Sequence, residues 1–331
     1  MKRIAVLNDY QGVVLSLPYW ARLGGRATVD VYRDTPADEG ALVRRLGQYE
    51  IVVPIRERTP FPASLLDRLP SLELLALTGR NSGHVDLEAA TARGILVTET
   101  EGSGASAIEH TIALLLAVVR RIPQEDRAMR QGGWQTGLAV DLSGKTLGIV
   151  GLGRIGSRIA GFGKFLGMRV LGWGPTLDDE RAAAAGARRV SLDDLFRESD
   201  VVSIHLRLSE RTRQIIKAEQ LSLMKPTAYL INTARGPLVE EEALIAALEQ
   251  NRIAGAALDV YEVEPLPEKH PLRSCETAVL SPHMGFVTRD AYHLFFSQAV
   301  EAIDKYLQGE VPPRALNPQV IARRETLARQ R

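Results

Sequence analysis

Three residues of this chain have side chains suited to proton transfer and anion binding, and each follows a short apolar run. They are Arg235 in Ile-Asn-Thr-Ala-Arg-Gly-Pro, Glu264 in Leu-Asp-Val-Tyr-Glu-Val-Glu-Pro and His283 in Ser-Pro-His-Met-Gly-Phe. A guanidinium can hold a carboxylate with two parallel hydrogen bonds. A histidine beside a carboxylate can supply a proton near neutral pH. Together these groups could reduce a carbonyl to an alcohol.

Each of the three residues, taken singly, more often has a structural role than a catalytic one. Their shared placement reverses that expectation, because all three stand in Gly- or Pro-flanked loops after predicted strands. Open α/β sheets bind ligands at the carboxyl ends of their strands. We therefore expect Arg235, Glu264 and His283 to be the catalytic residues.

The stretch from 147 to 156 indicates what lies beside them. A short apolar run leads into Gly151, Gly153 and Gly156 at G-x-G-x-x-G spacing, and an amphipathic segment follows. The order of strand, glycine turn and helix is typical of a dinucleotide site. The three glycines permit, respectively, the turn, the approach of a pyrophosphate and close packing of helix on strand. The helix N-terminus offers N–H groups to the phosphates.

The acidic residue expected at the end of the next strand is missing. That strand ends Val-Leu-Gly-Trp, and Gly174 stands where an Asp or Glu normally binds the ribose and repels a 2′-phosphate. Asp178 comes four residues late. Arg207, in His-Leu-Arg-Leu, could reach a 2′-phosphate or point to water. NAD and NADP both stay open as cofactors.

Composition sets the broad class. At 331 residues the chain is long enough for two domains, and its formal net charge of +1 favours neither nucleic acid nor a membrane surface. The single cysteine excludes an internal disulfide, and no spacing of the six histidines suggests a metal site. The longest apolar run, Ile112 to Val119, is too short for a membrane span. We expect a soluble, cytoplasmic protein.

The pattern of short apolar runs and helical spacing predicts an α/β fold with two doubly wound parallel sheets. Residues 103–287 form the dinucleotide-binding domain, and residues 1–102 plus 288–331 form the other, since a final helix at Arg289–Leu307 returns to it. The expected strands of the first domain are Arg3–Leu7, Thr28–Tyr32, Ile51–Pro54, Leu74–Thr78 and Ile95–Thr98. Those of the second are Thr146–Val150, Arg169–Trp173, Val201–His205, Ala228–Asn232, Gly255–Asp259 and Ala278–Ser281.

From Ile51 to Leu307 the sequence resembles the D-isomer-specific 2-hydroxyacid dehydrogenases, which include phosphoglycerate dehydrogenases and glyoxylate/hydroxypyruvate reductases. The resemblance rests on the glycine fingerprint and on the segments 200–205, 224–236, 257–265 and 281–285. It implies Rossmann-like and flavodoxin-like domains with the active site in the cleft between them. It also implies an NAD(P)-dependent oxidoreductase that interconverts a 2-keto acid and a D-2-hydroxy acid, with NAD(H) as the usual cofactor.

The resemblance assigns roles residue by residue. Arg235 binds the substrate's carboxylate, His283 is the acid/base and Glu264 pairs with it, while Asp259 binds the nicotinamide amide. The remaining expected cofactor residues are Gly151, Gly153, Arg154, Ile155, Gly156, Gly174, His205, Arg207, Thr233, Ala234 and Gly285. In the first domain, Arg56, Gly79, Arg80 and Asn81 are expected to contact the substrate, the last three through backbone N–H groups. The apolar 106–121 helix and Trp134 suggest a homodimer.

Other interpretations fit less well. Gly144-Lys-Thr resembles the end of a P-loop, but the required first glycine is Ala139. A formate dehydrogenase would have an amide where Glu264 stands, and a lactate- or malate-type enzyme would carry its fingerprint near the N-terminus. An NAD-sensing corepressor, a binding protein with little turnover, could keep all three catalytic residues and remains the alternative.

Overall fold

The computed structural model describes residues 1–80, 83–102 and 104–321 and contains two compact units. Unit 1 comprises Met1–Ser103 and Thr288–Arg331, and unit 2 comprises Gly104–Val287. The sequence-based division at residues 102/103 and 287/288 lies within one residue of these limits. Asn81, an expected substrate residue, lies outside the described part of the chain.

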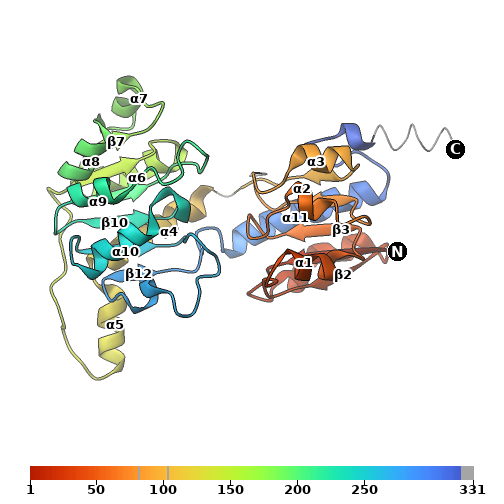
Figure 1. Ribbon diagram of the computed structural model, residues 1–331, viewed down its shortest axis with the longest axis horizontal. Helices are drawn as coiled ribbons and strands as arrows, with labels where there is room; N and C mark the ends of the chain where they lie inside the picture. The colour runs from red at the N-terminus through yellow and green to blue at the C-terminus, as the bar shows by residue number, and fades with distance from the viewer. Residues whose placement is uncertain (81–82, 103, 322–331) are drawn as a thin grey trace. The chain divides into compact units, whose positions relative to one another are not determined.

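Unit 1 is a five-stranded parallel sheet covered by helices (Figure 1). Its order β2-β1-β3-β4-β5 is that of flavodoxin-like folds. The strands are β1 (Lys2–Leu7), β2 (Ala27–Val31), β3 (Ile51–Pro54), β4 (Leu74–Ala76) and β5 (Leu96–Thr98). The helices are η1 (Val14–Ser16), η2 (Pro18–Leu23), α1 (Glu39–Leu46), α2 (Ala63–Leu66), α3 (Leu87–Ala92) and α11 (Arg289–Leu307).

The apolar strand residues form the core of unit 1. β3 is buried along its whole length, as expected for a strand covered on both faces of a parallel sheet. Asp38 and Asp86 cap the first turns of α1 and α3 by accepting backbone N–H groups. Helix α11 matches its predicted limits and packs against β4 and η2, with Phe295 and Phe296 fully buried.

Unit 2 has seven parallel strands in the order β12-β11-β10-β9-β6-β7-β8. This is the Rossmann order 3-2-1-4-5-6 with one further strand. The strands are β6 (Thr146–Val150), β7 (Arg169–Trp173), β8 (Arg188–Arg189), β9 (Val201–Ile204), β10 (Tyr229–Asn232), β11 (Gly255–Leu258) and β12 (Ala278–Leu280). The prediction of six strands was wrong by one: β8 is two exposed arginines, which carry no apolar signal.

Helices cover both faces of the unit 2 sheet (Figure 1). They are α4 (Gly104–Val119), α5 (Ile122–Arg130), α6 (Arg154–Phe165), α7 (Asp179–Ala184), α8 (Leu192–Glu198), α9 (Ala218–Leu223) and α10 (Glu241–Glu249), with η3 (Gly236–Leu238) and η4 (Pro271–Ser274). Neighbouring residues of one strand enter opposite cores: Leu230 joins the cluster under α8–α10, and Ile231 joins the cluster under α4 and α6. Helix α5 buries none of its residues.

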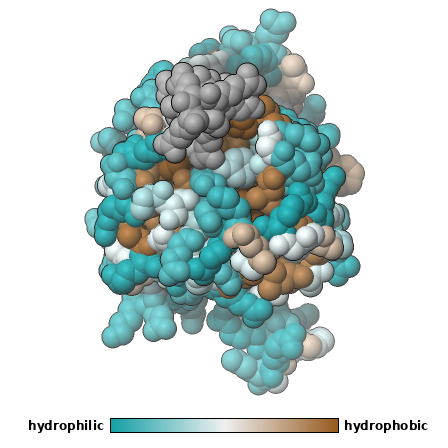
Figure 2. Space-filling model, turned by 90° about the vertical axis from the view of Figure 1, so that its right-hand side faces the viewer, coloured by the Kyte–Doolittle hydropathy of each residue, from teal (hydrophilic) through white to brown (hydrophobic). Residues whose placement is uncertain are grey.

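Hydrophilic residues predominate on the face of the molecule drawn in Figure 2, and hydrophobic ones are interspersed among them. Among the described residues, no helix has both the length and the apolar character needed to cross a membrane.

Candidate active site

The glycine fingerprint lies where β6 meets β9, the point at which the strand order of unit 2 reverses. Gly151 follows β6 with φ +100°, and a Cβ there would lie 2.7 Å from the His205 carbonyl carbon. A Cβ on Gly156 would overlap the Gly151 carbonyl. The predicted reasons for these two glycines, a tight turn and close packing, are therefore confirmed.

Gly153 is the N-cap of α6 and has open space where a side chain would project. The first-turn N–H groups of this 12-residue helix begin at the exposed Arg154 and the half-buried Ile155. A helix N-terminus beside an open glycine backbone is chemically suited to a pyrophosphate. Gly151, Gly153 and the first turn of α6, which together form the fingerprint cradle, thus have the backbone groups that a pyrophosphate site needs.

Gly174 directly follows β7, at the position predicted for a ribose-binding acid. A Cβ there would meet only Leu177 Cβ, at the ordinary contact distance of 3.5 Å, so the backbone does not require glycine. Asp178 is not a displaced substitute, because its carboxylate caps α7 by accepting the Arg181 N–H at 2.8 Å. Arg207 is exposed on the loop after β9.

His205, at the end of β9, is kept neutral by its surroundings. Its ring is packed among protein atoms although part of the residue surface is accessible, and this burial lowers its pKa to about 4. Its Nε2 lies 2.9 Å from the Ser203 hydroxyl oxygen. At neutral pH the His205 side chain is therefore a polar but uncharged ring, next to the point between β6 and β9 where the strand order reverses.

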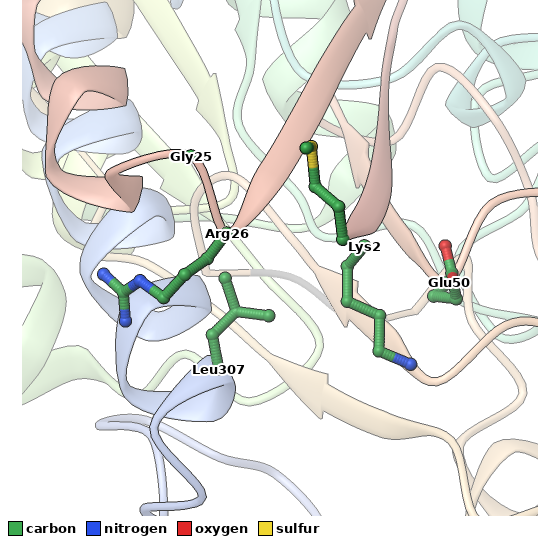
Figure 3. Close-up of a pocket in the computed structure, with 6 residues that line it drawn as sticks. Lys2, Gly25, Arg26, Glu50 and Leu307 are labelled. Carbon is green, nitrogen blue, oxygen red and sulfur yellow. The ribbon is translucent and has the colours of Figure 1, made fainter.

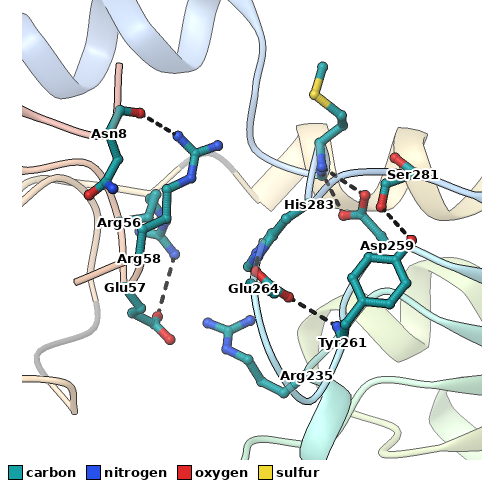
Figure 4. A network of polar contacts seen from close by, with 12 residues as sticks. Asn8, Arg56, Glu57, Arg58, Arg235, Asp259, Tyr261, Glu264, Ser281 and His283 are labelled. Carbon is teal, nitrogen blue, oxygen red and sulfur yellow. Dashed lines mark hydrogen bonds and ion pairs between the residues drawn. The ribbon is translucent and has the colours of Figure 1, made fainter. Parts of the chain in front are cut away.

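His283 and Glu264 form the closest acid–base pair of the site (Figure 4). His283 Nδ1 lies 2.6 Å from Glu264 Oε2, and the two side chains are 20% and 30% exposed. The other carboxylate oxygen accepts the backbone N–H of Tyr261 at 3.0 Å. The rings of His283 and Phe286 form an edge-to-face pair, with centroids 5.5 Å apart. The pairing expected from the sequence is present within unit 2.

A buried polar network holds the backbone that carries His283. His283 has φ +53°, an uncommon conformation for a non-glycine residue. Asp259 accepts the next two backbone N–H groups, from Met284 at 2.7 Å and Gly285 at 2.9 Å (Figure 4). These contacts fix the turn and so the direction of the imidazole.

His110 completes this network, and sequence reasoning missed it. Its Nε2 lies 3.0 Å from Asp259 Oδ1 and 2.9 Å from Ser281 Oγ. Burial alone would raise the pKa of Asp259, but hydrogen bonds from His110, Ser281 and the Met284 N–H outweigh it and lower that pKa. A single histidine on an apolar helix gives no signal that could have identified it.

The loop after β10 brings Arg235 beside the Glu264 loop. Arg235 Nη1 donates to the Ala234 carbonyl at 2.6 Å, and Thr233 Oγ1 lies 2.7 Å from Thr111 Oγ1 of α4. Gly236 is buried: a Cβ there would lie 2.6 Å from the Glu262 nitrogen and nearer still to the Tyr261 carbonyl. Only glycine lets these two loops approach so closely.

Three of the expected substrate residues of unit 1, Arg56, Gly79 and Arg80, follow the carboxyl ends of β3 and β4. Arg56 donates from Nη1 to the Thr78 carbonyl at 3.1 Å, and its guanidinium lies over Gly79. Figure 4 shows the ion pair of Arg56 with Glu57, at 3.8 Å. Arg80 pairs with Glu101 at 3.9 Å. The Gly79 N–H, expected to bind substrate, donates to Thr100 Oγ1 at 2.6 Å, and its contact with substrate stays a prediction.

A pocket elsewhere in unit 1 does not share this chemistry. Figure 3 shows it near the starts of β1 and β2, lined in part by Lys2, Arg26 and Glu50. Its cations are paired, Lys2 with Glu73 at 2.7 Å and Arg26 with Asp304 at 2.5 Å. Within the described parts of the chain, no three His, Cys, Asp or Glu side chains gather as metal ligands.

Comparison with known proteins identifies the family. Residues 112–285 match the model for the D-isomer specific 2-hydroxyacid dehydrogenase, NAD binding domain. The chain belongs to the D-isomer specific 2-hydroxyacid dehydrogenase family. The matched range contains the glycine fingerprint together with Arg235, Glu264 and His283. Unit 2 of this dehydrogenase is therefore its nicotinamide dinucleotide-binding domain, and the protein is an oxidoreductase.

Individual relatives agree with that assignment. The dehydrogenase is 43% identical to a glyoxylate reductase from Aeropyrum pernix over 271 residues, 79% of this chain and 81% of the relative. It is 35% identical to a D-3-phosphoglycerate dehydrogenase from Synechocystis over 88% of this chain, but only 52% of that longer protein. A phosphoglycerate oxidoreductase from Vibrio cholerae has a similar structure, with a TM-score of 0.88, 40% identity and coverage of 93% and 99%.

Proposed function

We propose that this dehydrogenase interconverts a 2-keto acid and the corresponding D-2-hydroxy acid, with His283 as the acid/base. The observation that carries the proposal is the 2.6 Å contact between His283 Nδ1 and Glu264 Oε2. The carboxylate accepts from Nδ1, which leaves Nε2 to face a substrate oxygen. The pair resembles the base and orienting carboxylate found in other acid–base sites.

Each residue then has a distinct task in the reaction. In reduction, His283 Nε2 gives its proton to the keto oxygen, and in oxidation it takes the proton from the hydroxyl. Glu264 holds the imidazole in orientation, and Arg235 binds the substrate carboxylate. When bound, the nicotinamide cofactor supplies or accepts the hydride. Since glyoxylate reductases and phosphoglycerate dehydrogenases are both relatives, small 2-keto acids are the substrate class.

We assign the cofactor to the fingerprint cradle and the strand ends beside it. Gly151, Gly153, Arg154, Ile155 and Gly156 would hold the pyrophosphate. The nicotinamide end would meet Thr233, Ala234, Asp259 and Gly285, and His205, Arg207 and Gly174 would surround the adenosine. Because Gly174 supplies no carboxylate, we propose that the protein accepts NADPH as well as NADH.

The test is steady-state turnover of glyoxylate, hydroxypyruvate, phenylpyruvate and phosphohydroxypyruvate with each cofactor. We expect His283→Gln to lower kcat by about a hundred- to ten-thousandfold while cofactor affinity is retained. Arg235→Ala should reduce kcat/KM on every keto acid, and Arg56→Ala only on substrates with a second anionic group. An unchanged kcat in His283→Gln would contradict the acid/base role. Cofactor affinity without flux on any substrate would favour a binding protein.

We also propose that the dehydrogenase is a homodimer formed through unit 2. Helix α5 buries none of its residues, and the segment after it exposes Trp134 by 73% and Leu138 by 95%. Apolar side chains exposed together in this way mark protein interaction surfaces. Sedimentation at micromolar concentration should give a dimer, and Trp134→Asp with Leu138→Asp should give a monomer. A wild-type monomer would contradict the proposal.

A further inference from the structure

A second histidine–carboxylate pair lies beside the loop that carries Glu264. His270 Nε2 is 3.0 Å from Glu241 Oε1, and the two side chains are only 16% and 19% exposed. Glu241 is the first residue of α10, and His270 is the N-cap of η4. The pair joins two segments of unit 2 that are 29 residues apart in the sequence.

The hydrogen-bond pattern defines which atom of His270 carries the proton. His270 Nδ1 accepts the backbone N–H of Leu272 at 3.4 Å, so Nε2 must be the donor to Glu241. The second oxygen of Glu241 accepts the backbone N–H of Glu262 at 3.1 Å. Both oxygens of this half-buried carboxylate are therefore used, and it ties α10, η4 and the Glu262 backbone together.

Glu262 is two residues before Glu264, in the segment that presents Glu264 to His283. One side of this segment is held by Tyr261, whose hydroxyl donates to the carbonyls of Leu258 and Ser281 at 3.2 and 3.0 Å. The Tyr261 N–H in turn donates to Glu264. The carboxylate of Glu241 adds an anchor at Glu262, the residue that follows Tyr261.

We propose that Glu241 and His270 are positioning residues for Glu264. Glu241 holds the Glu262 backbone at the place from which Glu264 reaches His283, and His270 holds the Glu241 carboxylate in that orientation. Neither is one of the residues proposed to bind the substrate or the cofactor. The proposal rests on the proposed role of the His283–Glu264 pair, and it adds the group that sets the geometry of that pair.

A competing explanation is that Glu241 merely stabilises the N-terminus of α10 through the helix dipole. The chain offers a matched control for this effect, because Glu242 is also acidic, lies in the same first turn and is exposed. A carboxylate at either position in this first turn stabilises the helix through the same dipole effect. Replacing either residue removes the same charge, but only Glu241 contacts Glu262 and His270.

The experiment compares Glu241→Ala, Glu241→Gln and Glu242→Ala in the full chain. We expect Glu241→Ala to lower kcat by roughly tenfold to a hundredfold, since displacement of a catalytic group by about 1 Å costs up to that much. The keto-acid KM and the cofactor Kd should stay within about threefold. Glu241→Gln keeps one oxygen for the Glu262 N–H and should recover part of the loss, while Glu242→Ala should match wild type.

A proton NMR readout separates positioning from general damage. The Nδ1–H of His283, recognised as the downfield signal absent from His283→Gln, should shift upfield or broaden in Glu241→Ala and be unchanged in Glu242→Ala. A kcat for Glu241→Ala within threefold of Glu242→Ala, with an unshifted signal, would overturn the proposal. If His283→Gln itself kept its kcat, the proposed function would fail, while a signal shifted by Glu241→Ala would still support the positioning role.

Discussion

Gly236→Ala tests whether the closeness of two loops sets the catalytic geometry. A Cβ at residue 236 would lie 2.6 Å from the Glu262 nitrogen and nearer to the Tyr261 carbonyl, whereas ordinary contact begins at 3.4 Å. Both opposing atoms are backbone, so no side chain can rotate away. The two loops must therefore separate by about 1 Å, and they carry Arg235 on one side and Glu264 on the other.

A separation of that size should be far more costly to turnover than to folding. A misplacement of about 1 Å can cost a hundredfold in rate, whereas overpacking destabilises a protein by about 1–3 kcal/mol. We expect Gly236→Ala to fold with a lower Tm and to lose roughly a hundredfold in kcat, with cofactor affinity retained because the fingerprint cradle is untouched.

The measurement is kcat on a 2-keto acid, together with cofactor titration and a thermal melt. Gly161→Ala is the matched control: it makes the same change on the exposed surface of α6, where a Cβ would meet nothing within 4 Å. That control should keep wild-type kcat and gain slight stability. If Gly236→Ala retains kcat within threefold of Gly161→Ala, the loops do not set the geometry as argued.

Three further predictions concern the cofactor and the buried polar groups. Gly174→Asp should raise the ratio of kcat/KM with NADH to that with NADPH by at least tenfold, because the new carboxylate repels a 2′-phosphate; an unchanged ratio would show that residue 174 does not face the ribose. His205 has a folded pKa of about 4 against 6.5, so unfolding free energy should fall as pH drops from about 6.5 towards 4, by at most ~3 kcal/mol. In denaturant titrations at pH 7 and 5, the unfolding free energy of His205→Asn should fall less between the two pH values than that of wild type. An equal fall in both proteins would contradict the lowered pKa of His205. His110→Ala should lower the unfolding free energy by about 1–3 kcal/mol at pH 7, because buried Asp259 loses a hydrogen-bond donor. Since the pKa of Asp259 is lowered, the stabilisation that its carboxylate gives the folded state is present above pH 3.8 and is lost as the pH falls further. The difference in unfolding free energy between wild type and His110→Ala should therefore become smaller in acid.

Much of the fold could be predicted because its determinants are local. Strands β3 and β4 are continuous buried apolar runs, and helix α11 lies at its predicted limits, Arg289–Leu307. The fingerprint glycines could be explained in advance, since Gly151 and Gly156 answer to the backbone geometry of one turn. Strand β8 could not be predicted, because two exposed arginines pair with β7 only through the tertiary structure.

In the candidate site, too, residues with a local sequence signal could be predicted and residues recruited by tertiary contacts could not. Arg235, Glu264 and His283 could be proposed from residue type and position after a strand. His110 and the Glu241–His270 pair contact the segments that carry His283 and Glu264. They do so through residues 21 to 149 positions apart, which leave no local pattern. The acceptor of the Gly79 N–H, the Thr100 hydroxyl, could not be predicted for the same reason, because a loop 21 residues later supplies it.

The discontinuity of unit 1 has a consequence for the order of events during synthesis. Its sheet is encoded first, yet Phe295 and Phe296, which are fully buried, come from α11 near the other end of the chain. The Val97 N–H likewise donates to the Asn317 side chain, which is synthesised 220 residues later. Unit 2 is continuous and can complete its core while α11 is still unmade. During synthesis the strands of unit 1 therefore emerge before unit 2 but join a finished domain only after it, and their apolar side chains must stay unaggregated until then.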